Sequence, residues 1–311
     1  MAKELKIREL SPKLLEVAKK ELNEDPKRRS ADVQAIRDWL KKQPHILAAP
    51  DDQTLVSFLR GCKFSLERTK EKIDMYYTMR TIVPEFFGVR NLKEQAIKEI
   101  LENGSFFPLP EPDDEGCRVM LVRPARNDPD RHPMELVFKV VMMAMDYMIR
   151  EDDQMLICGI VSIIDLENVT LNHGVQMTPA LIKKVMTCSQ EGFPLREKGL
   201  NYVHTPPMFE TIFGLFKTFA KEKLKKRMHA HGENMESLYK NVPQRLLPSE
   251  YGGTAGSTKE LNEAWLKRLR TYDPWFMEET GGVDESKRPG KPKTHQELFG
   301  LEGSFRQLTV D

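Results

Sequence analysis

Cysteine is scarce in this 311-residue chain, and its four cysteines, Cys62, Cys117, Cys158 and Cys188, include no C-x-x-C pair. The first residues, Met-Ala-Lys-Glu-Leu-Lys, are too charged for a secretory signal peptide. Free thiols in a reducing compartment are the default for such a chain. We therefore expect a cytoplasmic protein without disulfides.

No apolar run is long enough to cross a bilayer. The longest, Leu136 to Ile149, has 14 residues and is interrupted by Lys139 and Asp146, whereas a spanning helix needs about 20. Any membrane contact should therefore be peripheral. A strong net charge is also missing, since the formal charge is +1 with 31% charged and 40% apolar residues. This balance is typical of a soluble globular protein and argues against a nucleic-acid partner.

The sequence does contain a strongly apolar segment that is followed directly by a basic one. Residues 206–216 are apolar nearly all round, and residues 217–227 hold six cations and one anion. Apolar side chains beside clustered cations suit contact with an anionic bilayer. A buried helix followed by a solvated basic helix is the alternative interpretation. At helical spacing one apolar stripe contains Phe209, Ile212, Phe213, Phe216, Ala220, Leu224 and Met228.

Elsewhere the pattern alternates between helices and short apolar strands. Helix start signals such as Ser11-Pro12 and Asp51 occur within the first ninety residues. Strands are predicted at 118–123, 159–166 and 200–205, with a possible fourth at 228–231, and helices lie between them. This order predicts an α/β domain with a mainly parallel sheet, preceded by a small all-α bundle.

These changes in character divide the chain into four parts. We expect an N-terminal helical domain at 1–90, an α/β domain at 91–256, a C-terminal helix at 257–276 and a flexible tail at 277–311. The tail is predicted from the glycine, proline and charge between Thr280 and Lys293. Within it, the apolar residues 298–301 could dock elsewhere.

Four segments in a fixed order resemble the CRAL-TRIO lipid-binding family, on the branch of tocopherol and retinaldehyde carriers. They are 51–64 in the helical part, 159–167 (GIVSIIDLE), 191–196 (EGFPLR) and 246–253 (LLPSEYGG). The resemblance covers roughly residues 20 to 275. It implies an α/β domain that encloses one hydrophobic molecule in a pocket, with a movable helix over the mouth that meets the membrane.

The predicted pocket combines strand periodicity with this resemblance. On the strand at 159–166, Ile160 and Ile164 share one face, and the resemblance adds residues from neighbouring segments. Met142, Asp146 and Val169 depart from the side chains that contact ligand in tocopherol carriers, so the ligand stays open among a tocopherol, a retinoid, a carotenoid and a phospholipid. Asp146 could accept a hydrogen bond from a ligand hydroxyl or face solvent. The predicted pocket residues are Met142, Asp146, Ile160, Ile164, Val169, Val185, Cys188, Ser189, Phe193, Leu195, Ile212, Phe213 and Leu215.

Two further sites follow from the resemblance. The membrane gate maps onto residues 206–219, with Met208, Phe209, Ile212, Phe213 and Phe216 as its apolar side chains. A cleft for phosphoinositide head groups maps onto Arg196, Lys198, Lys223 and Arg227, since several converging cations suit a phosphate. A further arginine of that cleft is Cys62 here, flanked by Arg60 and Lys63.

These features predict an intracellular carrier that exchanges a hydrophobic ligand at phosphoinositide membranes, with the protein peripherally attached. The alternative is a lipid-sensing interaction module that signals ligand occupancy to an unidentified protein partner. An enzyme is disfavoured because no nucleophile or acid–base grouping is recognisable. His229 and His231 lack a third ligand at a recognisable spacing, so we expect no metal and no cofactor.

Overall fold

The computed structural model describes residues 6–278 and 281–300. The chain begins with short helices that start where the sequence provides caps. Ser11 accepts a hydrogen bond from the Leu14 amide ahead of a first-turn proline, and Asp51 accepts one from Thr54. These helices are α1 (Pro12–Leu22), α2 (Arg29–Leu40), α3 (Asp52–Gly61), α4 (Leu66–Ile82), α5 (Pro84–Phe87) and α6 (Gln95–Glu102).

A five-stranded sheet follows, in the spatial order β1-β2-β3-β4-β5. Its edge strand β1 runs antiparallel to β2, and the remaining pairs are parallel. The predicted α/β class with a mainly parallel sheet is therefore confirmed. Only β1 had no counterpart in the sequence analysis, because it has three residues. The strands are β1 (Phe106–Pro108), β2 (Arg118–Val122), β3 (Ile160–Asp165), β4 (Glu197–Val203) and β5 (Met228–Gly232).

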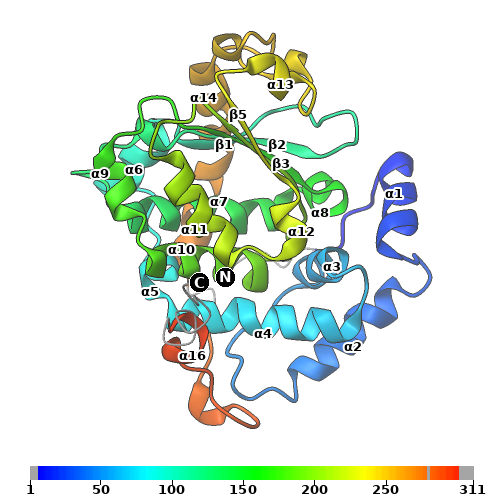
Figure 1. The fold of residues 1–311 in the computed structure, drawn as a ribbon. Coiled ribbons are helices and arrows are strands. Elements are labelled where there is room, and N and C mark those ends of the chain that lie inside the picture. The colour runs from blue at the N-terminus through cyan, green and yellow to red at the C-terminus, as the bar shows by residue number, and fades with distance from the viewer. Residues whose placement is uncertain (1–5, 279–280, 301–311) are drawn as a thin grey trace, which may run out of the picture.

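Helices cover both faces of this sheet (Figure 1). In that view α7, α8, α10 and α11 lie below the sheet and α13 lies above it. A π-helical turn, Cys188–Gly192, directly follows α10. The remaining helices are α7 (Met134–Glu151), α8 (Asp153–Cys158), α9 (Leu171–Gln176), α10 (Pro179–Thr187), α11 (Phe209–Phe219), α12 (Glu222–Lys225), α13 (Met235–Tyr239), α14 (Thr258–Leu269), α15 (Asp273–Met277) and α16 (His295–Phe299).

The apolar stripe from Phe209 to Met228 does not form one helix. α11 ends at Ala220, whose backbone is extended (φ −78°, ψ 138°), and the Lys221 amide donates to Gln190 Oε1 at 2.8 Å. The chain must turn here because β5 has to return alongside β4 for parallel pairing. The stripe residues nevertheless share one apolar cluster with Ile182 and Tyr202.

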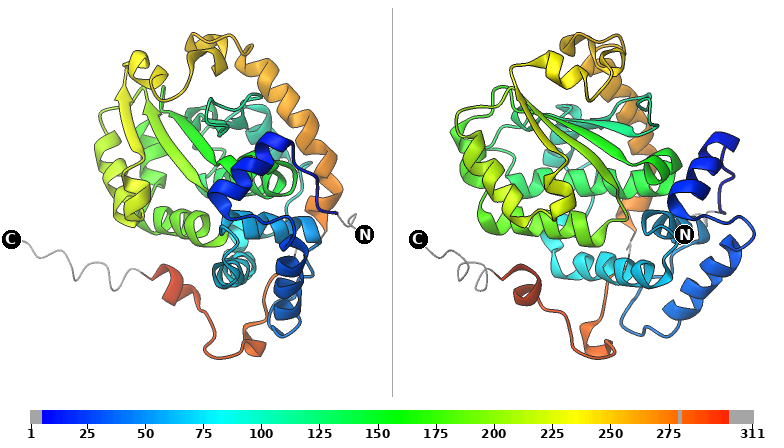
Figure 2. Two further views of the ribbon diagram at one scale, coloured as in Figure 1. Left: turned by 90° about the vertical axis from the view of Figure 1, so that its right-hand side faces the viewer. Right: turned by 45° about the vertical axis from the view of Figure 1, so that its right-hand side comes forward.

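Residues 281–300, which we call the C-terminal clasp, are not a loose tail. The clasp lies below α4, on the side away from the sheet (Figure 2). Val283 forms a β-bridge with Ile46, and its amide donates to Thr81 Oγ1 at 2.8 Å. Further along, Phe299 is 4% exposed within the main core, and Lys183 of α10 donates to the Gly300 carbonyl. The rest of the predicted tail, 279–280 and 301–311, lies outside the described residues.

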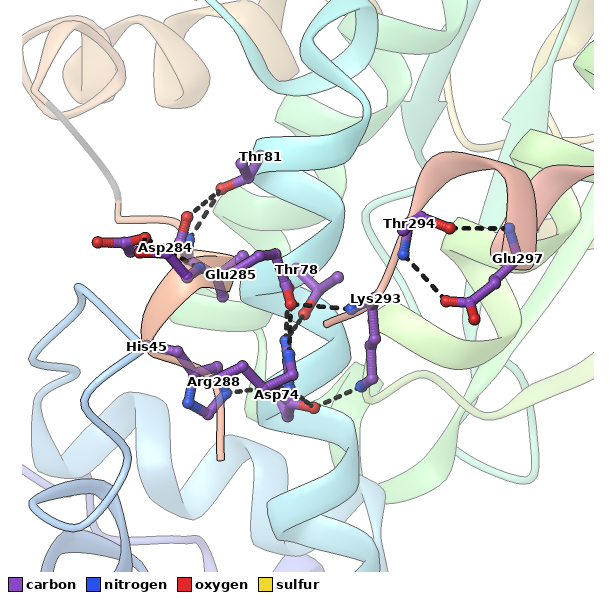
Figure 3. A network of polar contacts seen from close by, with 12 residues as sticks. His45, Asp74, Thr78, Thr81, Asp284, Glu285, Arg288, Lys293, Thr294 and Glu297 are labelled. Atoms are coloured by element: carbon purple, nitrogen blue, oxygen red, sulfur yellow. Dashed lines mark hydrogen bonds and ion pairs between the residues drawn. The ribbon is translucent and has the colours of Figure 1, made fainter. Parts of the chain in front are cut away.

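Asp74 of α4 is the main polar attachment of the clasp (Figure 3). Arg288 donates from one nitrogen to both of its carboxylate oxygens at 2.8 Å, and Lys293 and His45 also donate to it. Burial acts to raise the pKa of Asp74, but the hydrogen bonds from these residues outweigh it and lower that pKa. The charged residues from which we predicted a flexible tail therefore form ion pairs in a partly buried cluster.

Asp74→Asn should lower the free energy of unfolding by about 1–3 kcal/mol, because it removes the carboxylate shared by Arg288, Lys293 and His45 and leaves Glu285 as the remaining carboxylate partner of Arg288. It should also speed proteolysis within residues 281–300. Asp38→Asn is the matched control, since Asp38 pairs with Lys41 at the surface and such pairs contribute about 0–1 kcal/mol. Denaturant unfolding and limited proteolysis measure both effects. Equal behaviour of the two variants would contradict the assignment.

Candidate functional site

A cavity of about 1110 Å³ lies between the sheet and α11. Alternate residues of β3 and β4 face it, because Ser162 pairs with Leu200 and Ile164 pairs with Tyr202 across the parallel strands. The first half of α7 supplies the facing wall. Apolar side chains predominate in the chamber, as expected of a site for a hydrophobic molecule: they include Val122, Met134, Val137, Phe138, Val141, Ile164, Leu166, Met177, Met186, Leu200 and Met228.

The predicted pocket residues fall into two groups. Some line the cavity: Ile164, Val169, Ser189, Leu195, Ile212 and Phe213. The others lie outside its lining, and all but Leu215 are buried: Met142, Asp146, Ile160, Val185, Cys188, Phe193 and Leu215. The difference arises because the resemblance identifies segments, whereas the side-chain direction at each position decides which residue reaches the cavity.

Asp146 faces neither the cavity nor solvent. It is 1% exposed and accepts hydrogen bonds from Tyr76 at 2.8 Å, Arg80 at 2.5 Å and Arg90 at 2.7 Å. Arg80 also lies over the Tyr76 ring, 3.6 Å from its centroid. The carboxylate of Asp146 therefore joins α7 to α4 and to the segment after α5.

The side chains of the predicted gate line the cavity from α11 and the residue before it. Phe209 and Phe213 are each 6% exposed and stack on one another with ring centroids 4.6 Å apart. Both rings pack on Tyr202 of β4, at 5.4 and 5.1 Å. Met208, Ile212 and Phe216 also border the cavity. In this conformation the largest apolar side chains of α11 point inward, and its exposed face carries Glu210, Thr211, Gly214, Lys217 and Thr218.

The four predicted head-group cations come together at one end of the cavity, from β4, from α12 and from just before β5. We call Arg196, Lys198, Lys223 and Arg227 the basic cleft. Arg227 lowers the pKa of Lys223 most, followed by burial and by the positive charges of Lys63, Arg196 and Lys198. Lys63 also borders the cavity, with Cys62. Arg60, by contrast, is fully buried in ion pairs with Glu24 and Asp153, so it does not replace the missing arginine at Cys62.

One carboxylate already occupies this cleft. Glu21, on α1, lies 2.7 Å from Arg196 and 3.8 Å from Lys198, and the hydrogen bond from Arg196 contributes most to lowering its pKa. Glu21 is exposed, so solvent screens this pair. An intramolecular anion therefore sits where the sequence predicts a phosphate.

Glu197 is a cavity residue that the sequence analysis missed. It borders the cavity between Arg196 and Lys198, and Ser162 donates to its Oε1 at 3.1 Å. Burial raises the pKa of Glu197 to about 8, although the hydrogen bond from Ser162 and the charge of Arg227 act in the opposite direction. In the sequence Glu197 is a single acid between two cations, and alternation alone would turn it away from the face of Leu200 and Tyr202. A register shift between Ile160 and Val161 brings Glu197 beside Ser162, and that irregularity has no signal in the sequence.

Within the part of the chain that the structure describes, one group has the geometry to hold a metal ion. Asp165, Glu167 and His204 bring ligand atoms within 4.8 Å of one another. Both carboxylate oxygens of Asp165 have protein partners, however: His204 lies 2.7 Å from Oδ1, and Tyr251 donates a hydrogen bond to Oδ2. This cluster ties the strand exit to the segment 246–253. His231 is likewise engaged, by Ser237 and Asn201.

No helix within residues 6–278 and 281–300 has the length and apolar content required to cross a membrane.

Two family models match the α/β domain and the helical region. The CRAL/TRIO domain matches residues 102–253, and a Pinta-like UBA domain matches residues 25–97. Alpha-tocopherol transfer protein-like from Homo sapiens is 36% identical over 272 residues, covering 87% of this chain and 78% of that protein. Clavesin-2 from Rattus norvegicus is 30% identical over 245 residues, covering 78% and 75%. The crystal structure of Sfh5 aligns with a TM-score of 0.46 and 12% identity, covering 85% of this chain and 98% of that chain.

The chain thus combines an α/β domain that encloses a mainly apolar cavity with a preceding helical region. With these matches, the chain belongs to the CRAL-TRIO lipid-binding family.

Glu197→Gln should become more stable than the wild type as the pH rises. The folded-state pKa of Glu197, about 8, exceeds its ordinary value of 4.5, so its ionisation weakens the fold between those two values. The melting-temperature difference between variant and wild type should grow from about pH 4.5 to about pH 8 and then level off. Glu16→Gln, an exposed change on α1, should give a flat difference. A flat profile for Glu197→Gln as well would refute the burial argument.

Proposed function

We propose that this protein is a carrier that binds one hydrophobic small molecule in the cavity and exchanges it at phosphoinositide-containing membranes. The observation that carries the proposal is the continuity of one cavity, which runs from an apolar chamber under α11 to the basic cleft. A ligand leaving the chamber would pass side chains suited to a bilayer interior and cations suited to its charged surface. The proposal assigns no catalytic step to any residue.

The gate role is proposed for α11. Its contacts with the rest of the protein are mainly apolar, through Phe209 and Phe213 on Tyr202 and through packing on α10. A bilayer offers the same phenylalanine side chains an equivalent apolar environment, so moving α11 outward at a membrane replaces one set of apolar contacts with another. In water the same movement would expose both rings.

The ligand class is proposed from the chamber and from the relatives. The cavity of about 1110 Å³ is large enough for a tocopherol, a retinoid, a carotenoid or a phospholipid, since small-molecule sites range over about 300–1,000 Å³. One relative is named a tocopherol transfer protein-like protein, which favours an isoprenoid among these. Native mass spectrometry of the purified protein, followed by solvent extraction, tests the proposal: a single hydrophobic species is expected. Protein that retains none of the four classes after incubation would overturn it.

A lipid-sensing interaction module is the second candidate, and the C-terminal clasp favours it. Lys183 of α10 donates to the Gly300 carbonyl, and α10 shares an apolar cluster with α11 through Ile182 and Met186. A displacement of α11 would therefore act on the clasp through one helix. Transfer of extracted ligand between two vesicle populations separates the candidates, because a carrier accelerates this transfer and a sensor does not.

The basic cleft gives a prediction with a charge-matched control. Lys223→Ala should weaken binding to vesicles containing bisphosphorylated phosphoinositide about fivefold, since one cation near an anionic surface contributes about 1 kcal/mol. Lys226→Ala removes the same charge from the same segment, but Lys226 is exposed and does not border the cavity. It should change affinity less than twofold. Sedimentation with vesicles at fixed salt measures both, and equal losses would point to a general charge effect.

Glu21→Gln should change binding in the opposite direction in the same assay, because it frees Arg196 and Lys198 from a competing carboxylate. We expect affinity to rise about threefold to fivefold. Glu16→Gln removes an equal charge from the same helix and should leave affinity within twofold. If Glu21→Gln bound no better than Glu16→Gln, the competition between Glu21 and a phosphate would be excluded.

A further inference from the structure

Helix α4 lies between the C-terminal clasp and the π-helical turn that follows α10. On one face of α4, Asp74, Thr78 and Thr81 form hydrogen bonds with the clasp (Figure 3). Lys72 precedes Asp74 by two positions and therefore points to the opposite side of the helix. On that side the π-helical turn packs on α4, and Lys72 donates to the Gln190 carbonyl at 2.6 Å. The clasp thus supports the turn from behind α4.

Helix α10 is the second support of the π-helical turn, and the clasp contacts this helix too. α10 runs directly into the turn, and α16 of the clasp packs on α10. Phe299 of α16 is buried in the main core, and Lys183 of α10 donates to the Gly300 carbonyl. The clasp therefore contacts both helices that position the turn. Residues 281–300 lie outside both matched family models, so this arrangement is not part of the matched domains.

The π-helical turn holds the C-terminal end of α11 through the side chain of Gln190. Its amide nitrogen donates to the Phe219 carbonyl at 3.1 Å, and its amide oxygen accepts a hydrogen bond from the Lys221 amide at 2.8 Å. These two bonds lie on either side of Ala220, where the helix ends. Glu191, the next residue of the turn, forms an exposed ion pair with Lys221 at 2.6 Å. An outward movement of α11 requires these bonds to break, or the turn to move with the helix.

We propose that the C-terminal clasp is a strap that holds the gate closed, acting on α11 through α4, α10 and Gln190. The inference rests on the proposed function, since it concerns regulation of the gate of the same cavity. Gln190 is a positioning residue in this arrangement. When the clasp detaches, the π-helical turn loses part of its support, so the two Gln190 bonds break more often and α11 opens more often. Because coupling between two sites is reciprocal, opening of α11 at a membrane also loosens the clasp.

Amide hydrogen exchange of the full-length protein tests the strap without any ligand. The readout is an exchange ratio, defined as the rate for the Lys221 and α11 amides divided by the rate for the β3 amides in the same sample. β3 is paired on both sides, with β2 and β4, so its amides report global unfolding. A substitution that only destabilises the whole fold accelerates exchange in β3 and does not raise this ratio. Opening of the gate raises it.

Phe299→Leu weakens the packing of α16 while leaving the rest of the clasp unchanged. The exchange ratio should rise about fivefold to tenfold, because α11 then opens more often than the core. Lys183→Met is the milder variant, since it removes only the hydrogen bond to the Gly300 carbonyl. It should raise the ratio about threefold, and its result decides the question if Phe299→Leu does not fold. An unchanged ratio in both clasp variants would overturn the strap.

The role of Gln190 has a matched control elsewhere in the chain. Gln190→Met removes both hydrogen bonds to the end of α11 and keeps the length of the side chain, so the exchange ratio should rise about tenfold or more. Gln176 also forms one donated and one accepted bond with backbone, to the Pro129 carbonyl at 2.6 Å and from the Met134 amide at 2.8 Å. Gln176→Met should leave the ratio within about twofold. Equal ratios for the two glutamine variants would remove Gln190 from the path and overturn the proposal.

Release of a bound probe connects the strap to ligand exit. The probe is 1,6-diphenyl-1,3,5-hexatriene, a fluorescent hydrocarbon, and the acceptor is phosphatidylcholine vesicles that contain an energy-accepting lipid. Phe299→Leu should release the probe about threefold to fivefold faster than the wild type. A raised exchange ratio with unchanged release would overturn the strap, because a strap on the gate must control exit. Wild-type protein that takes up neither this probe nor any of the four ligand classes would overturn the carrier function, whereas the exchange ratio would still decide whether the clasp restrains α11.

Discussion

The position of the cavity wall depends on one buried carboxylate. Asp146, in the second half of α7, is held by Tyr76, Arg80 and Arg90 from the helical region, and the first half of the same helix lines the cavity. Two guanidinium groups buried side by side are tolerable only while that carboxylate is present. The N-terminal helices are therefore part of what holds α7 at its distance from the sheet.

The sequence predicted those parts of the fold that depend on neighbouring residues, and it missed those that depend on contacts between residues far apart in the chain. The strand at 159–166 was predicted within two residues at each end because its apolar residues are contiguous and bounded by clear signals. The apolar stripe from Phe209 to Met228 did not indicate the break at Ala220, because an apolar period describes a helix and not where the chain must turn back to the sheet, whereas the resemblance placed the end of the gate at residue 219. The clasp was missed for a similar reason: Arg288 and its partner Asp74 are 214 residues apart, and composition reports only local polarity.

The candidate site shows the same limit at the level of single side chains. The resemblance identified the segments that surround the cavity, and the basic cleft is formed by residues named from it. Glu197 was overlooked because it lies between two cations and resembles part of a solvated charge run. Only the pairing of β4 with β3 shows that Arg196, Glu197 and Lys198 belong to both the cleft and the chamber. β4 and the residue before it therefore contribute side chains both to the basic cleft and to the chamber.

The C-terminal clasp has a consequence for the order in which the protein is assembled. Synthesis proceeds from the N-terminus, and domains tend to fold as their residues emerge from the ribosome. Residues 281–300 emerge after every residue that lines the cavity, so Asp74 and Ile46 gain their partners Arg288 and Val283 only after the walls of the chamber have been made. In a nascent chain the residues that line the cavity are therefore made before the clasp closes over α4.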